Sequence, residues 1–156
     1  MNIRIQLMLD GRQLEERPAP DAEVQAMWHK AVRSFSSSML PGLDADAAFT
    51  LLYQGTLQAS TAIVRAAGYR VRGDGHHHHT FAAVAAHGLG EASEAARDRN
   101  VIRQQRHGAV YDWERTTDDH ALAALRDAAQ RLFSAGAASL AAFRPHLTLV
   151  PAPIPS

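Results

Sequence analysis

The chain has 156 residues, of which 46% are apolar and 21% charged, and this composition indicates one folded domain rather than a disordered chain. The 16 basic and 16 acidic residues cancel, so a strongly basic coat for nucleic acid is excluded, although a local basic patch is not. The absence of cysteine excludes disulfides, thiolate metal sites and thiol catalysis. No apolar run approaches the roughly 20 residues that span a bilayer, and the N-terminus does not have the pattern of a signal peptide, so a cytoplasmic protein is expected.

Residues 1–20 allow two interpretations. The apolar residues at positions 3, 5, 7 and 9 alternate, which is typical of a strand, but Ile3 and Leu7 would equally suit one turn of a helix. Asp10 and Gly11 indicate a turn after this segment.

Two long helices are predicted next. Apolar residues recur at intervals of three and four over 21–39, where Asp21 is a candidate cap. The second helix, over 44–67, begins at Asp44 or Asp46 and has a stripe of small residues, within which Gly55 favours a close helix contact.

The second half of the chain contains more polar segments. Gly68 is a candidate left-handed C-cap, and residues 69–79 are predicted to form a loop. Three helices are predicted to follow: a short one over 80–87, for which Thr80 is a candidate cap, a polar one over 91–107 and a long one over 117–143. The proline-rich tail over 144–156 is predicted to be extended. The predicted fold is therefore a single all-α domain over residues 1–156, a bundle of about five helices.

The loop over 69–79 contains the most distinctive polar residues. Arg70 and Arg72, together with glycine amides, could hold a phosphate, and the alternative is a structural loop in which Asp74 pairs with an arginine. Four consecutive histidines follow, beginning with His76 and His77. Adjacent histidines point in different directions, so at most two could bind one ion, and no metal or other cofactor is predicted.

A third polar cluster belongs to the predicted helix over 91–107. Arg99, Arg103 and Arg106 would share one helix face, beside Asn100. This face is either a solvated surface with local salt bridges or a cationic stripe for an RNA backbone, with His107 and Tyr111 at its end as candidate proton-transfer groups.

The strings YRVRGDGHHHHTF and RNVIRQQRHGAVYD, followed by a long Ala/Leu helix, resemble proteins of the HEPN superfamily. The resemblance covers about residues 12–143 and implies a helical bundle that dimerises. Many HEPN proteins are metal-independent ribonucleases with an R-x(4–6)-H motif. Here Arg106 matches the arginine of that motif, but Tyr111 stands where the histidine would be, so the motif is degenerate.

The resemblance therefore implies a protein that binds RNA, a nucleotide or an antitoxin-like partner in a stress or toxin–antitoxin setting. The substrate would meet Arg70, Arg72, His76, His77, Arg99, Asn100 and Arg103. One alternative is an active ribonuclease in which Arg106 acts with His107 or Tyr111 as the catalytic residues. Another is a scaffolding homodimer without catalysis.

Overall fold

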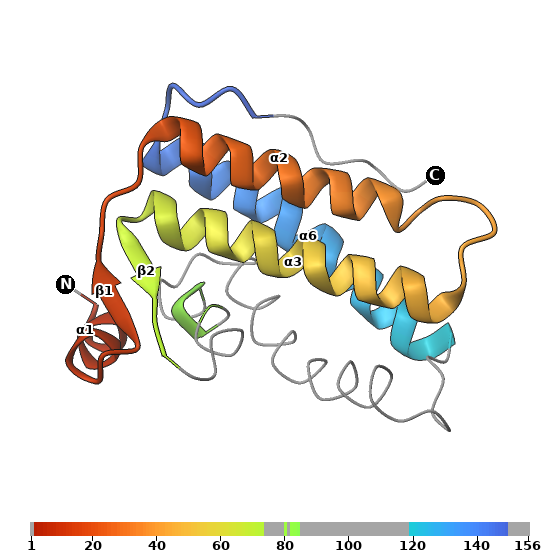
Figure 1. Ribbon diagram of the computed structural model, residues 1–156, viewed down its shortest axis with the longest axis horizontal. Coiled ribbons are helices and arrows are strands. Elements are labelled where there is room, and N and C mark those ends of the chain that lie inside the picture. Colours follow the sequence, from red (N-terminus) through yellow and green to blue (C-terminus); the bar gives the residue numbers. More distant parts are fainter. Residues whose placement is uncertain (1, 74–79, 81, 85–118, 150–156) are drawn as a thin grey trace.

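The computed structural model describes residues 2–73, 80, 82–84 and 119–149 (Figure 1), and 71% of these residues are helical. The helices are α1 (Ile3–Asp10), α2 (Asp21–Ser37), α3 (Ala45–Ala66) and α6 (Asp119–Phe143), and residues 80 and 82–84 are also helical. The strands β1 (Leu14–Glu16) and β2 (Tyr69–Val71) form one antiparallel pair. The expected all-α architecture is thus confirmed for the described residues, with one small sheet added.

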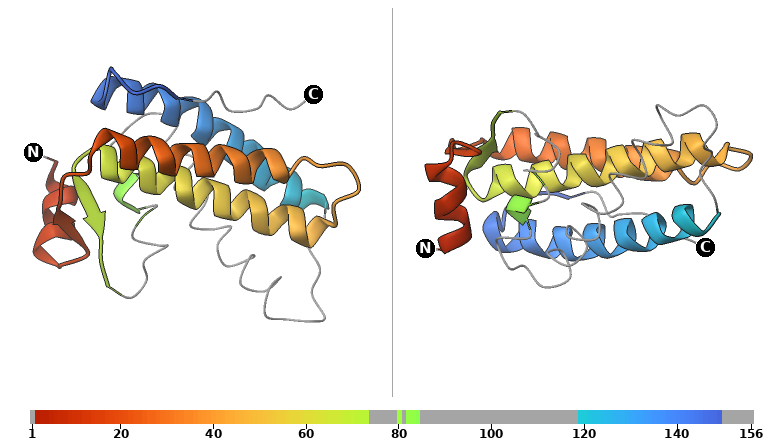
Figure 2. Two further views of the ribbon diagram at one scale, coloured as in Figure 1. Left: turned by 45° about the horizontal axis from the view of Figure 1, so that its top comes forward. Right: turned by 90° about the horizontal axis from the view of Figure 1, so that it is seen from below.

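The core lies between the three long helices. α3 packs against α2 on one side and against α6 on the other, and the three run alongside one another in both views of Figure 2. The buried residues of α6 form one seam that faces the core; among them are Leu122, Leu125, Ala128, Ala129, Leu132, Gly136 and Leu140. Large aromatic side chains fill the centre of the bundle: Trp28 and Phe35 of α2 contact Phe133 of α6.

The predicted close contact at Gly55 is also confirmed. A Cβ atom added to Gly55 would lie 3.3 Å from the carbonyl oxygen of Ala31 and 3.3 Å from the backbone nitrogen of Phe35. Both are backbone atoms of α2, so a side chain at this position would force the backbone of α2 to shift by a few tenths of an ångström. Glycine is therefore needed for the spacing between α2 and α3.

Replacing Gly55 should consequently destabilise the bundle. We expect Gly55→Val to lower the free energy of unfolding by about 2 kcal/mol, because overpacking between rigid backbones costs about 1–3 kcal/mol. Gln54→Val is the matched control, since Gln54 is the preceding residue of α3 and is exposed. Urea unfolding of both variants tests this, and equal losses for the two would contradict the close contact as the cause.

Residues 2–16 form a helix and then a strand, which settles the two interpretations of this segment. Asn2 caps α1 by accepting hydrogen bonds from the backbone nitrogens of Arg4 (2.9 Å) and Ile5 (3.4 Å). The buried residues of α1 are Ile5 and Met8, so the helical spacing of three, and not the strand alternation, places side chains in the core.

The prediction of a loop over 69–79 is wrong for its first three residues. Tyr69–Val71 form β2, whose partner is β1, far away in sequence. A strand of three residues is too short to show a recognisable alternation of apolar and polar residues. Its hydrogen-bonding partner, β1, precedes α2 and α3 in the sequence, whereas β2 follows them. Gly68, just before it, has the predicted left-handed conformation, with φ of 97°.

One of the predicted N-terminal helix caps is confirmed and two are wrong. Asp44 caps α3, and its carboxylate accepts from the backbone nitrogen of Ala47 at 3.3 Å. Asp21 does not cap α2, because it is the first helical residue and its carboxylate pairs with Arg144 instead. Thr80 is itself helical rather than a residue preceding the helix.

Several predictions lie outside the described residues. They concern the helix over 91–107, the start of the last helix at 117, the histidines at 76–79 and the end of the tail after 149. The described part of the tail lies along α2, where Gln25 accepts from the backbone nitrogen of Thr148 (3.1 Å), and the ring of His29 lies 3.3 Å from the carbonyl oxygen of Thr148.

Candidate functional site

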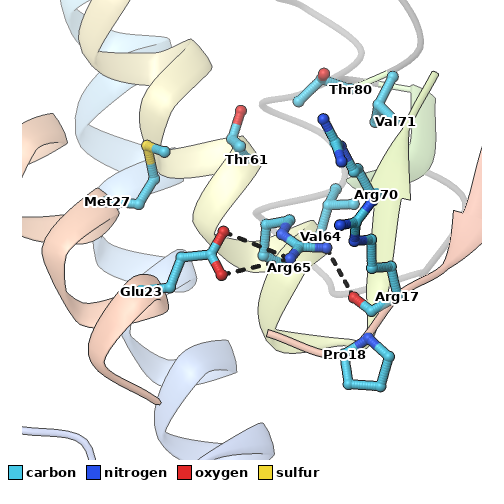
Figure 3. Close-up of a pocket in the computed structure, with 10 residues that line it drawn as sticks. All are labelled: Arg17, Pro18, Glu23, Met27, Thr61, Val64, Arg65, Arg70, Val71 and Thr80. Carbon is cyan, nitrogen blue, oxygen red and sulfur yellow. Dashed lines mark hydrogen bonds and ion pairs between the residues drawn. The ribbon is translucent and has the colours of Figure 1, made fainter. Parts of the chain in front are cut away.

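A cavity of about 480 Å³ opens beside the small sheet, where the end of α3 and the start of α2 meet it (Figure 3). We call this cavity the arginine pocket, because three arginines line it together with one carboxylate and several apolar side chains. Its lining residues are Arg17, Pro18, Glu23, Met27, Thr61, Val64, Arg65, Arg70, Val71 and Thr80.

The register of the sheet explains why charged side chains gather here. Glu15 of β1 lies directly opposite Arg70 of β2, and alternate residues of a strand face the same side. Arg17 and Arg72 are therefore on the same face as this pair. Val71 is buried on the opposite face, so the sheet separates an apolar side from a charged side.

Arg65 is the fixed member of the pocket. One of its terminal nitrogens donates to the carbonyl oxygens of Arg17 (2.7 Å) and Tyr69 (3.1 Å), and the other pairs with Glu23 at 3.4 Å. The side chain of Arg65 is only 11% exposed, whereas that of Glu23 is 49% exposed. Arg65 thereby ties the end of α3 to the chain on both sides of the sheet, which gives it a structural role as well as a charge.

Arg70 differs from its neighbours because its guanidinium makes no ion pair with any residue that the structure describes. The carboxylate across the sheet is already shared: Glu15 pairs with Arg72 at 3.5 Å and with Arg17 at 3.8 Å. In Figure 3 the side chains of Arg17 and Arg70 extend from the sheet toward the cavity. Among the described residues, therefore, no carboxylate neutralises the positive charge of Arg70, which is exposed beside the pocket.

The chemistry of this arrangement favours an anion. A guanidinium binds carboxylate and phosphate oxygens through two parallel hydrogen bonds, and such charge-assisted bonds are about twice as strong as neutral ones. A volume of about 480 Å³ lies in the range of pockets for small ligands, about 300–1,000 Å³. Among the residues that the structure describes, no three histidine, aspartate or glutamate side chains come together as a metal-binding group.

Of the predicted site residues, Arg70 and Arg72 lie within the described part of the chain, on β2 and directly after it. The others fall outside the described residues, as does the expected proximity of the loop at 72–79 to the turn at 106–111; they are His76, His77, Arg99, Asn100, Arg103, Arg106, His107 and Tyr111. The alternative pairing of Asp74 with an arginine is outside them too.

Sequence reasoning missed the other charged residues of the arginine pocket, which are Arg17, Glu23 and Arg65. Arg65 is an ordinary basic residue in the last turn of a helix, and Arg17 follows a segment whose structure was ambiguous. The packing of α2 on α3 and the pairing of β1 with β2 bring them together, so no local pattern could have shown the pocket.

The chain matches no family model, no curated protein and no solved structure. Among the described helices, none is both long enough and apolar enough to cross a membrane.

Proposed function

We propose that this protein binds a phosphate group of RNA or of a nucleotide in the arginine pocket. The observation that carries the proposal is the guanidinium of Arg70, which lines the pocket beside Arg17 and has no ion pair with the described residues. The anchored Arg65 adds a third positive charge and Glu23 neutralises only one, so the described residues that line the pocket have a net positive charge. A phosphate would supply the missing counter-charge.

The sequence alone supports the finer parts of this proposal. These are a HEPN-like homodimer, a cytoplasmic location and an antitoxin-like partner in a stress or toxin–antitoxin setting. The alternative of an active ribonuclease depends on Arg106, His107 and Tyr111, and the alternative of a scaffolding dimer requires that the arginine pocket bind nothing.

Removing the charge of Arg70 should weaken binding. We expect Arg70→Ala to lower the affinity for a fluorescent adenine nucleotide by about tenfold or more, because a hydrogen bond to a charged group contributes about 1.5–3 kcal/mol. Fluorescence anisotropy measures this directly. The affinity of the parent protein should also fall as salt rises, since phosphate contacts are screened.

Arg126→Ala is the matched control, because Arg126 is an exposed arginine on α6 that does not line the pocket. Its affinity should equal that of the parent. A parent protein that binds neither nucleotides nor oligonucleotides would overturn the proposed function, and so would an Arg70→Ala variant that binds like the parent.

A further inference from the structure

The arginine pocket continues along the charged face of the sheet. A second, shallower cavity of about 400 Å³ shares Arg17, Arg70 and Val71 with it and extends to Arg72 and Gly73. Glu15 lines this second cavity from the other strand. The two cavities together form a groove along the sheet, which we call the ribbon groove.

A third cavity, of about 580 Å³, adjoins the far end of the ribbon groove. It shares Glu15, Arg72 and Gly73 with the second cavity, and Arg12 lies on its wall. Arg12 is exposed and has φ of 59°, a left-handed conformation that is uncommon for a residue other than glycine. Arg12 and Arg72 line this third cavity together with Glu15 and Glu16, so its charges balance, and the excess of positive charge lies in the ribbon groove.

The spacing of these side chains is regular. Arg70 and Arg72 are two residues apart on one face of the strand, so their Cα atoms are separated by about 6.8 Å. This distance is comparable to the separation of successive phosphates in an extended phosphodiester strand, and it exceeds the separation of phosphates within a single nucleotide polyphosphate. A pocket for one phosphate would not require a second arginine at this position.

The counter-charge in the groove is weakly held. Glu15 lies 3.5 Å from Arg72 and 3.8 Å from Arg17, and both distances exceed the roughly 2.7–2.9 Å of a direct charge-assisted hydrogen bond. The side chains of Arg17 and Arg72 are 59% and 56% exposed. Exposed pairs of this kind contribute only about 0–1 kcal/mol, so a phosphate could take the place of the Glu15 carboxylate at either arginine.

We infer that the ribbon groove binds a linear chain of phosphates, with one phosphate in the arginine pocket at Arg17 and Arg70 and the next at Arg72. The inference rests on the proposed function and extends it from a single phosphate to a chain. Two sources share this chemistry: a single-stranded nucleic acid, whose spacing the arginines match, and inorganic polyphosphate. Since the groove would contact the phosphates of the nucleic acid, it should bind RNA and DNA strands equally well.

The test compares oligomers with monomers in two variants of the full-length protein. We expect a fluorescein-labelled 12-nucleotide oligo(dT) to bind at least tenfold more tightly than a labelled mononucleotide. Arg72→Ala should weaken oligo(dT) binding several-fold and leave mononucleotide binding unchanged. For Arg72→Ala, the slope of log affinity against log salt concentration should also become shallower by about 0.7 for each phosphate contact that is lost.

Glu15→Gln should change oligo(dT) binding in the opposite direction. It removes the competing carboxylate and keeps the size of the side chain, so affinity should rise several-fold. A ribo-oligomer should compete as well as the deoxy-oligomer. Unlabelled polyphosphate with the same number of phosphates identifies the source: weaker competition than oligo(dT) assigns a nucleic-acid strand, and stronger competition assigns polyphosphate.

Two results would overturn the inference and leave the proposed function intact. One is mononucleotide binding that depends on Arg70 while Arg72→Ala and Glu15→Gln leave oligo(dT) binding unchanged. The other is equal affinity for the mononucleotide and the oligomer. If neither ligand binds the parent protein, the inference and the proposed function are both overturned. Circular dichroism of each variant ensures that a loss of binding reflects the side chain and not unfolding.

Discussion

Trp28→Ala should lower the free energy of unfolding by about 3–5 kcal/mol, the range for deleting a large aromatic side chain from a core. Trp28 is 0% exposed, and its ring centroid lies 5.4 Å from that of Phe133 on α6. Its ring also faces Gly136, where an added Cβ would come within 3.3 Å of it. The tryptophan of α2 thus fills the space that the small residue of α6 leaves open, and alanine would leave a cavity there.

The size of this loss is large compared with the stability of a domain, about 5–15 kcal/mol. Urea unfolding followed by circular dichroism measures it. Trp28→Phe is the control, because phenylalanine keeps an aromatic ring next to Phe133 and leaves a smaller cavity, so its loss should be intermediate. A Trp28→Ala variant within about 1 kcal/mol of the parent would contradict the packing described above.

The second large effect concerns Arg144, which follows α6. Its guanidinium pairs with Asp21 at 2.6 Å and donates to the carbonyl oxygens of Ala19 (2.9 Å) and Ala66 (3.3 Å). It is 20% exposed, so these bonds are partly shielded from water. One side chain therefore connects the end of α6, the start of α2 and the end of α3.

We expect Arg144→Ala to lower the free energy of unfolding by about 3 kcal/mol. Removing one partner of a shielded ion pair costs about 3–5 kcal/mol when the pair is buried, and the exposure of Asp21 reduces that cost. Arg144→Lys should recover part of the loss, because an ammonium can reach Asp21 but cannot serve all three acceptors. Urea unfolding of both variants tests this. If Arg144→Ala had the same free energy of unfolding as the surface variant Arg126→Ala, the result would contradict the prediction.

The long helices were predictable because each has a repeated pattern. Val24, Trp28 and Phe35 recur on one face of α2, and the seam of α6 continues over about five turns, so local sequence sets which side faces the core. Gly55 and Gly68 were also interpretable, because a glycine within or just after a helix usually indicates a close backbone approach or a left-handed conformation. The structure confirms each of these features.

The candidate site was only partly predictable. The sequence indicated Arg70 and Arg72 because arginines between glycines are conspicuous, but it placed them in a loop. Their actual position depends on hydrogen bonds between β1 and β2, and Asp21 is similarly engaged by Arg144, which lies near the other end of the chain. Pairings of this kind depend on the whole fold, because the two partners are far apart in the sequence and no short segment shows them both.

The pairing of β1 with β2 also has a consequence for the order of folding. The strands are separated along the chain by all of α2 and α3, whose mutual contacts are between neighbouring segments. Joining distant segments costs loop-closure entropy, so we expect α2 and α3 to associate before the ribbon closes. With only three residues in each strand, the ribbon is also the part expected to open most readily while the aromatic core stays intact. An anion that bridges its arginines would therefore act on the equilibrium between the open and closed ribbon, and would stabilise the closed form by mass action.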